Sequence, residues 1–209
     1  LGILIEQYKS LSLHQNISDG DRFFWNTTTG WMMWNYALGS LLCGAKLCLY
    51  DGAANHPDIG VQWRFAKEAQ INHFGNGSPL FIASMKQNIK DVNQIELSKL
   101  KTIGATGSPL SEDAFIWLQN KLPKTQIISL SGGTDVCSAF IGGCTMLPVY
   151  SGYLQCNMLG AAIEAWDENK KPILNQTGEL VITQPLPSMP VFFWNDHNLT
   201  RSFILFQKI

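Results

Sequence analysis

Hydrophobic and polar positions follow two different spacings along the first 149 residues. Apolar residues at helical spacing predict helices at residues 2–12, 31–42, 58–73 and 79–87, and one that begins at residue 111. Short apolar runs bounded by turn residues predict strands at 23–25, 46–50, 101–105 and 126–130. Residues 74–78, which contain two glycines, are predicted to form a loop. Strands that alternate with helices favour an α/β fold with a mostly parallel sheet and flanking helices.

Single residues mark several of the predicted helix ends. Gly44 stands where a helix C-cap is expected, since glycine takes the left-handed conformation at low cost. Asp58 and Ser111 are predicted N-cap residues, and Glu112 and Asp113 follow Ser111 where the helix dipole favours acids. The apolar positions at helical spacing in the first predicted helix are Ile3, Leu4, Tyr8 and Leu11.

The pattern changes after residue 149. Residues 161–166 and 179–183 are predicted strands, and residues 167–170 between them have the composition of a turn. Three prolines at 185, 187 and 190 then prevent regular structure. The sequence therefore predicts an α/β subdomain at 1–149 and a β-rich antiparallel subdomain at 150–209.

Composition excludes some classes of partner. The net charge of −1 and the lack of a basic run argue against nucleic acid as a partner. No apolar stretch reaches the roughly 18 residues of a membrane helix, so no membrane association is expected. The five cysteines form no C-x-x-C pair, which indicates reduced thiols and a cytosolic location. The four histidines are scattered along the chain, which argues against a zinc site.

Several common catalytic motifs are absent from the sequence. It contains no G-x-x-x-x-G-K-[ST] phosphate loop and no G-x-G-x-x-G after a predicted strand. It also contains no G-x-S-x-G turn for a serine nucleophile and no H-x-x-x-H metal motif. Composition and spacing by themselves leave the function open.

Three other segments lie at the ends of predicted strands, where open α/β sheets bind ligands. They are Thr27-Thr-Thr-Gly-Trp-Met-Met-Trp-Asn35, Gly104-Ala-Thr-Gly-Ser-Pro-Leu-Ser111 and Ser131-Gly-Gly-Thr-Asp135. Taken together and in this order, they resemble the adenylate-forming acyl-CoA synthetases, and most closely the branch that activates acetoacetate. The likeness continues through Gly178-Glu-Leu180, Pro187-Ser-Met-Pro-Val191 and Phe193-Trp-Asn-Asp196.

The resemblance implies a fold and a reaction. The chain would form part of the large N-terminal domain of such an enzyme. In the reaction, a carboxylate attacks the α-phosphate of ATP and releases pyrophosphate, and the thiol of coenzyme A then displaces AMP. The implied ligands are ATP, Mg²⁺, coenzyme A and acetoacetate, all small molecules. The oligomeric state cannot be read from the sequence.

The resemblance also assigns nucleotide-binding residues. Gly107, Ser108 and Pro109 resemble the segment that lies along the adenine, and Gly133 and Thr134 resemble the residues at the α-phosphate. Asp135 resembles the acid that holds Mg²⁺, so the catalytic residues are predicted to be Thr134 and Asp135. From local chemistry alone, these two segments could equally be a turn before a capped helix and a loop with a helix N-cap.

The acyl group is predicted to lie against Trp31, Met32, Met33 and Gly132. In acetyl-CoA synthetases, the position that Gly132 resembles carries a Trp that closes a small pocket, so glycine would admit a longer acid. Pocket volume discriminates by only about 1–3 kcal/mol per methylene, so this residue indicates a size class. Trp31, Met32 and Met33 are also compatible with plain core packing at the start of a helix.

Some family features are missing from the sequence. The phosphate loop is expected before Leu1, and the ribose-binding aspartate and the C-terminal lid domain with its lysine are expected beyond Asn195-Asp196. Residues 202–209 no longer resemble the family, and Asn76-Gly77 replaces a usual Thr-Ser pair. The isolated chain is therefore expected to be an internal fragment that forms no adenylate. The alternatives are a ligase for another short or medium acid and a truncated, non-catalytic product.

Overall fold

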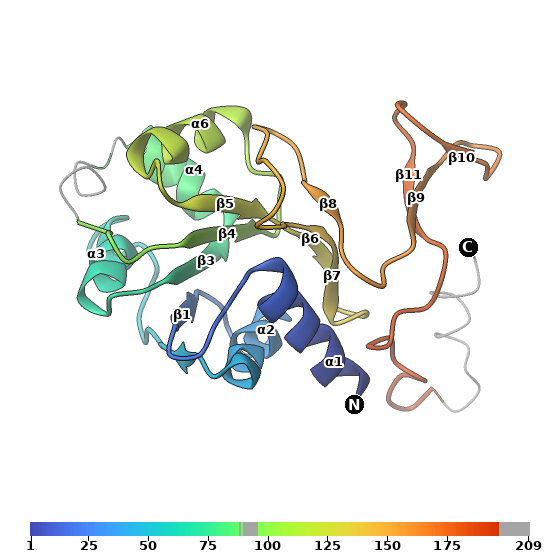
Figure 1. The fold of residues 1–209 in the computed structure, drawn as a ribbon, viewed down its shortest axis with the longest axis horizontal. Coiled ribbons are helices and arrows are strands. Elements are labelled where there is room, and N and C mark those ends of the chain that lie inside the picture. The colour runs from blue at the N-terminus through green and yellow to red at the C-terminus, as the bar shows by residue number, and fades with distance from the viewer. Residues whose placement is uncertain (88, 90–95, 197–209) are drawn as a thin grey trace.

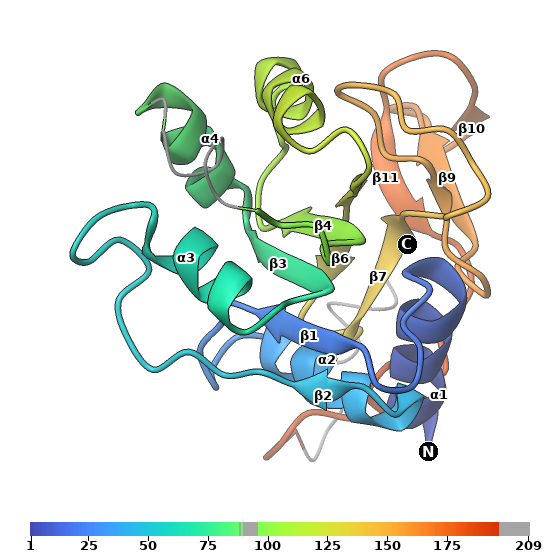
Figure 2. The ribbon, with the colours of Figure 1, turned by 60° about the vertical axis from the view of Figure 1, so that its left-hand side comes forward.

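A five-stranded parallel sheet lies at the centre of the fold, with strand order β2–β1–β3–β4–β5 (Figures 1 and 2). The structure is a computed structural model that describes residues 1–87, 89 and 96–196. The departure from the family predicted at residues 202–209 therefore lies outside the described residues. The strands of the sheet are β1 (Arg22–Trp25), β2 (Lys46–Leu47), β3 (His73–Gly77), β4 (Thr102–Thr106) and β5 (Gln126–Ser129). The predicted α/β fold with a mostly parallel sheet is confirmed.

Helices cover both faces of this sheet. In Figures 1 and 2, α3, α4 and α6 lie on one side, and α1 and α2 lie on the other. The helical segments are α1 (Gly2–Tyr8), the π-helical turn η1 (Lys9–His14), α2 (Met33–Gly39), the 3-10 turn η2 (Ser40–Cys43), α3 (Val61–Glu68), α4 (Ser78–Lys86) and α6 (Glu112–Lys121). Because alternate residues of a strand face opposite sides, Phe23 and Phe24 of β1 enter two different hydrophobic cores.

Two of the three predicted helix caps are as expected. Gly44 follows η2 with a φ of 76°, and the Ser111 hydroxyl accepts a hydrogen bond from the Ala114 amide at 3.4 Å. Asp58 instead accepts a hydrogen bond from the Gly60 amide at 2.8 Å, one turn before α3 begins. The helix predicted to reach residue 73 ends at Glu68, and Gln70 follows in the left-handed region with a φ of 52°.

The loop predicted at residues 74–78 is wrong, because residues 73–77 form the central strand β3. The glycines that favoured a loop are there for packing. Trp25, Gly75 and Gly104 lie side by side on β1, β3 and β4. The Trp25 indole covers both glycines: a Cβ on Gly75 would overlap the ring, and a Cβ on Gly104 would lie 2.5 Å from Cζ3. Glycine therefore allows the large ring to lie flat across the sheet.

The first helix is oriented opposite to its hydrophobic pattern. Of the apolar residues at helical spacing, only Leu11 is buried, and Ile3, Leu4 and Tyr8 are about half exposed. The buried residues of α1 are Glu6 and Gln7, at 2% and 3% exposure. Spacing predicted the helix correctly but could not predict that its polar side faces inward.

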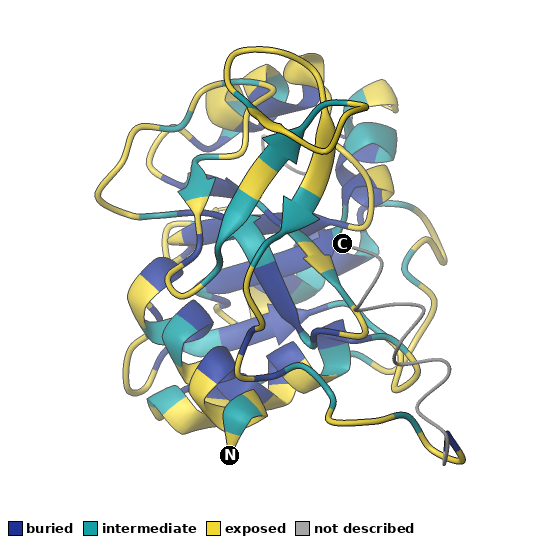
Figure 3. Ribbon diagram, turned by 90° about the vertical axis from the view of Figure 1, so that its right-hand side faces the viewer, coloured by how far each residue is buried: buried dark blue, intermediate teal, exposed yellow. Residues whose placement is uncertain are grey.

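Antiparallel strands follow the parallel sheet. They form two three-stranded sheets, with orders β6–β7–β8 and β10–β9–β11. The strands are β6 (Ser131–Gly133), β7 (Ser138–Gly142), β8 (Cys156–Asn157), β9 (Ile163–Trp166), β10 (Pro172–Ile173) and β11 (Glu179–Ile182). The predicted strands near 161–166 and 179–183 correspond to β9 and β11. Antiparallel pairing already starts at Ser131, and no residue of the β10–β9–β11 sheet is buried (Figure 3).

A hydrogen-bonded network of polar side chains, centred on the buried His73, crosses the amino-terminal ends of β3 and β4. The His73 Nε2 lies 3.0 Å from Asp21 Oδ2, and its Nδ1 lies 2.8 Å from the Thr102 hydroxyl. The other oxygen of Asp21 accepts a hydrogen bond from Lys101 Nζ at 2.7 Å. Burial lowers the pKa of His73, which keeps the imidazole neutral. The neutral ring can then donate from Nε2 to the carboxylate and accept the Thr102 proton at Nδ1.

Acidification below about pH 6.5 is expected to destabilise the fold. His14 is also buried: its Nδ1 lies 2.9 Å from the Gly143 carbonyl oxygen, and its Nε2 accepts from the Leu159 amide at 3.0 Å. Burial lowers the pKa of both His14 and His73 below the unfolded value. Their neutral forms therefore contribute stability that is complete above the unfolded pKa and is lost as the pH falls through that value toward the folded pKa.

Urea midpoints measured between pH 7.5 and 5 test this pH dependence. The midpoint is expected to fall with the pH in the wild type and to fall less in His14→Gln. Replacing the exposed His56 by glutamine is the matched control, and its pH profile should follow the wild type. A wild-type midpoint that stays constant over this range would contradict the assignment of two neutral buried histidines.

Candidate active site

A cavity of about 460 Å³ opens at the carboxyl ends of β4 and β5. This volume lies within the range of about 300–1,000 Å³ that is typical of small-molecule sites. Its walls come from residues 31–33 with Tyr36, residues 106–110 with Phe115, residues 129–134 with Ala139, and residues 152–154. All of the candidate residues except Asp135 line it. The topology of the sheet thus brings together three segments that are far apart in sequence.

The predicted adenine segment forms one wall of the cavity. Gly107 has a φ of 84°, a backbone conformation that favours glycine. The Ser108 carbonyl oxygen accepts a hydrogen bond from the Ser78 hydroxyl at 2.6 Å, which fixes the Gly107–Pro109 loop against the first turn of α4. A Cβ on Gly107 would lie 3.6 Å from the Trp31 ring, so the glycine leaves space beside that ring for an aromatic base. No sequence motif marked Ser78, although this residue follows Gly77 and begins α4.

The predicted acyl segment forms a second wall. Met32 and Met33 are buried and belong to the hydrophobic core, and Trp31 is half-buried. These residues therefore both pack in the core and line the cavity, the two alternatives that the sequence left open. Tyr36, one turn further along α2, also lines the cavity and was not predicted. Its hydroxyl donates to Gln15 Oε1 at 2.8 Å, which holds the ring in place.

The third wall is β6 and the turn that follows it. Gly132, Gly133 and Thr134 line the cavity, and the Thr134 carbonyl oxygen accepts a hydrogen bond from the Cys137 amide at 3.0 Å. A Cβ on Gly132 would lie 2.5 Å from the Ser138 carbonyl oxygen. This glycine is therefore required where β6 approaches β7, in addition to any effect on pocket size. A Gly132→Trp variant would displace the strand, so it cannot test pocket size alone.

Asp135 is exposed beside the cavity and does not line it. Within the described part of the chain, no three His, Cys, Asp or Glu side chains come together to hold a metal ion. A single carboxylate is compatible with Mg²⁺ that is held mainly by substrate phosphates and water, because this ion keeps several non-protein oxygen ligands. The residues present therefore fit a magnesium–nucleotide complex and do not fit a metal bound by the protein alone.

The Asn76-Gly77 pair, which departs from the family pattern, lies outside this cavity. The Asn76 amide nitrogen donates to Gln62 Oε1 at 2.6 Å, and Gln62 donates to Asn26 Oδ1 at 2.8 Å. Asn26 in turn donates to Asn76 Oδ1 at 3.4 Å. The three amides form a closed ring that joins the ends of β1 and β3 to α3, which indicates a structural role for Asn76.

Comparison with known proteins agrees with this geometry. The family model described as AMP-binding enzyme matches residues 3–190. The chain belongs to the AMP-binding enzyme family. Among curated members, it is 39% identical over 198 residues to an acetoacetyl-CoA synthetase of Gallus gallus, which covers 94% of this chain. It spans only 30% of the length of that relative.

Two solved structures show the same fold. Acetoacetyl-CoA synthetase from Streptomyces lividans matches with a TM-score of 0.92 and 42% identity, over 97% of this chain and 32% of that one. An anthranilate–CoA ligase solved with anthranoyl-AMP matches with a TM-score of 0.83 and 18% identity, over 98% of this chain and 38% of that one. The resemblance predicted from the sequence motifs is confirmed, including its partial length. No helix within residues 1–87, 89 and 96–196 has the length and apolar character needed to cross a bilayer.

Proposed function

We propose that the chain supplies the nucleotide- and acyl-binding part of an ATP-dependent ligase that activates acetoacetate and transfers it to coenzyme A. The observation that carries this proposal is the single cavity shared by residues 31–33, 107–109 and 132–134. These are the segments on which the resemblance to the acetoacetate-activating synthetases rests. The names of the relatives at about 40% identity support the same substrate.

The proposed roles follow the three walls. Gly107, Ser108 and Pro109 lie along the adenine. Gly133 and Thr134 donate to the α-phosphate, where charge increases during attack by the carboxylate of the acid. Asp135 ligates Mg²⁺ that accompanies the phosphates. The remaining wall, which receives the acyl chain, consists of Trp31, Met32, Met33 and Gly132.

The remaining parts of the proposal concern organisation and location. We place the boundary between the α/β subdomain and the β-rich subdomain at residues 149 and 150. Coenzyme A is proposed as the thiol acceptor because the relatives are CoA ligases by name. The partners are small molecules, without nucleic acid or membrane, and the proposed location is the cytosol.

Calorimetric binding of a sulfamoyl mimic of acetoacetyl-AMP, with and without Mg²⁺, tests the proposed site. Thr134→Val is expected to weaken binding by about tenfold, since a hydrogen bond to a charged group is lost. Asp135→Ala should remove the Mg²⁺ dependence. Glu168→Ala, an exposed acid in the turn between β9 and β10, is the matched control and should bind as the wild type does. Equal affinity in all four proteins would contradict the proposal.

ATP–pyrophosphate exchange with acetoacetate is expected to be undetectable for the 209-residue chain. The chain carries only part of the family's machinery, since the phosphate loop and the lid lysine are absent from its sequence. Detectable exchange would mean that the residues present suffice for adenylate formation.

A further inference from the structure

The turn that carries Thr134 and Asp135 has a strained backbone. Cys137 closes the turn with a φ of 47°, in the left-handed region that disfavours residues with a Cβ. The amide of Cys137 donates to the Thr134 carbonyl oxygen, which joins these two residues across the turn. Strained backbone persists only when surrounding contacts hold it, and it concentrates at functional sites.

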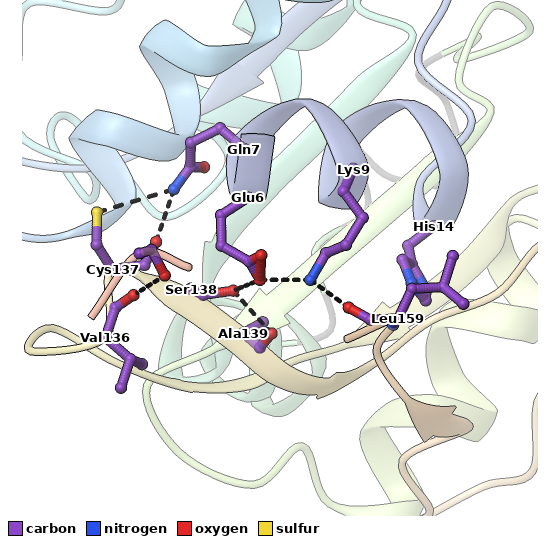
Figure 4. Close-up of polar contacts among 10 residues, drawn as sticks. Glu6, Gln7, Lys9, His14, Val136, Cys137, Ser138, Ala139 and Leu159 are labelled. Atoms are coloured by element: carbon purple, nitrogen blue, oxygen red, sulfur yellow. Dashed lines mark hydrogen bonds and ion pairs between the residues drawn. The ribbon is translucent and has the colours of Figure 1, made fainter. Parts of the chain in front are cut away.

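Two buried side chains from distant segments hold the carbonyl groups of this turn, and Figure 4 labels the first of them, Gln7. Gln7 Nε2 of α1 donates to the Cys137 carbonyl oxygen at 2.8 Å and lies 3.8 Å from its sulfur. The Ser188 hydroxyl donates to the Val136 carbonyl oxygen. Gln7 and Ser188 are 3% and 5% exposed, so both side chains are shielded from water.

The next residue along, Ser138, is held through its own side chain. The Glu6 carboxylate accepts a hydrogen bond from the Ser138 hydroxyl at 2.9 Å and forms an ion pair with Lys9. Lys9 Nζ also donates to the Leu159 carbonyl oxygen at 2.7 Å (Figure 4). Ser138 pairs with Gly133 across the β6–β7 ladder, so Glu6 fixes the strand directly behind the cavity wall.

The polar side of α1 faces inward because Glu6 and Gln7 hydrogen-bond to Ser138 and Cys137. Burying Glu6 and Gln7 while apolar side chains stay exposed costs free energy, and Gln7 Oε1 is buried without a hydrogen-bond partner. The backbone of the 187–188 segment lies against the start of α1. The approach is so close that a Cβ on Gly2 would overlap the Pro187 carbonyl. The polar side of the helix and Ser188 therefore converge on one turn.

We propose that Gln7 and Ser188 are positioning residues that hold the Cys137 and Val136 carbonyls, and thereby place Thr134 and Asp135 for the nucleotide. The phosphate and metal roles of those two residues rest on the function proposed above. The hold on the turn is a property of the free chain, so it can be measured without any ligand.

Amide hydrogen exchange of the free chain, followed by NMR, is the first test. Exchange of the Cys137 amide is expected to be about tenfold faster in Gln7→Ala and in Ser188→Ala, as loss of one hydrogen bond predicts. Gln126→Ala is the matched control, since Gln126 Nε2 donates to the Cys144 carbonyl oxygen at 3.0 Å, away from the cavity. It should leave Cys137 exchange unchanged. Unchanged exchange in both test variants would overturn the proposal, and Ser188→Ala decides alone if Gln7→Ala does not fold.

A double-mutant cycle with the sulfamoyl mimic and Mg²⁺ is the second test. Gln7→Ala is expected to weaken binding by about tenfold in the wild-type background and much less in a background that carries both Thr134→Val and Asp135→Ala, because it acts through these two residues. Equal losses in the two backgrounds would mean a purely structural role and would overturn the proposal. If the wild-type chain binds no mimic, the proposed function fails for this chain, and the exchange test still decides whether the two side chains hold the turn.

Discussion

Replacing Gly75 by alanine is expected to lower the free energy of unfolding by about 3 kcal/mol, which corresponds to a melting temperature lower by roughly 6–12 °C. A Cβ at this position would overlap the Trp25 ring, which lies flat over β3 and β4. Trp25 is itself buried between Phe23 and Tyr36, so its ring cannot move aside without disturbing both neighbours. Urea and thermal denaturation of the two proteins measure the effect.

The same strand provides a matched control. A Cβ on Gly77 would lie 3.5 Å from Pro79 Cδ, which is an ordinary contact. Gly77→Ala should therefore cost at most about 1 kcal/mol, which is the preference for glycine over alanine at the N-cap of α4. In a Trp25→Ala background the ring is absent, and Gly75→Ala should then also cost little. Similar losses for Gly75→Ala and Gly77→Ala would show that the ring does not require the glycine.

Replacing Asp21 by alanine is expected to cost about 3 kcal/mol, because it leaves the buried imidazole of His73 without an acceptor. Burial alone would raise the pKa of Asp21, but hydrogen bonds from Lys101, His73 and the Ser18 amide outweigh it and hold the pKa below its usual value. Because the folded pKa is lowered, this contribution is present above the unfolded pKa of about 3.9 and is lost as the pH falls below it.

Denaturation of Asp21→Ala at pH 7 and at pH 3 measures both parts of this expectation. The difference from the wild type should be large at pH 7 and smaller at pH 3. Asp58→Ala is the control, because the Asp58–Arg64 pair lies at the surface, and it should cost much less at pH 7. If Asp21→Ala lowers the free energy of unfolding no more than the control does, the hydrogen-bonded network around His73 does not stabilise the fold.

Local patterns in the sequence predicted most elements of the parallel sheet and its helices but not every orientation. Periodicity predicted α1, yet the inward side of that helix is set by a distant turn. Gln7 contacts Cys137, which lies 130 residues further along the sequence. Likewise, β3 was predicted as a loop because glycine has a low strand propensity, and only its neighbour Trp25 explains why glycine is needed. Such residues are chosen by tertiary contacts that no local window contains.

The candidate site shows the same division. Three motifs marked Gly107, Gly132 and Thr134 because their resemblance to a family does not depend on knowing the fold. Tyr36 and Ser78, which complete or support the walls, lie on helices and have no motif of their own. The short strands β7 and β8 were missed because neither shows the alternation that identifies a half-buried strand.

The sheet β10–β9–β11 is expected to unfold separately from the rest of the chain. None of residues 159–185 is buried, so this stretch shares little apolar surface with the two cores. Segments with few buried contacts open at low free energy and independently of the rest. Unfolding will therefore not be one cooperative event: the fluorescence of Trp166 should change at lower denaturant than that of Trp63. The main transition will report on the parallel sheet and on the two cores that pack against it.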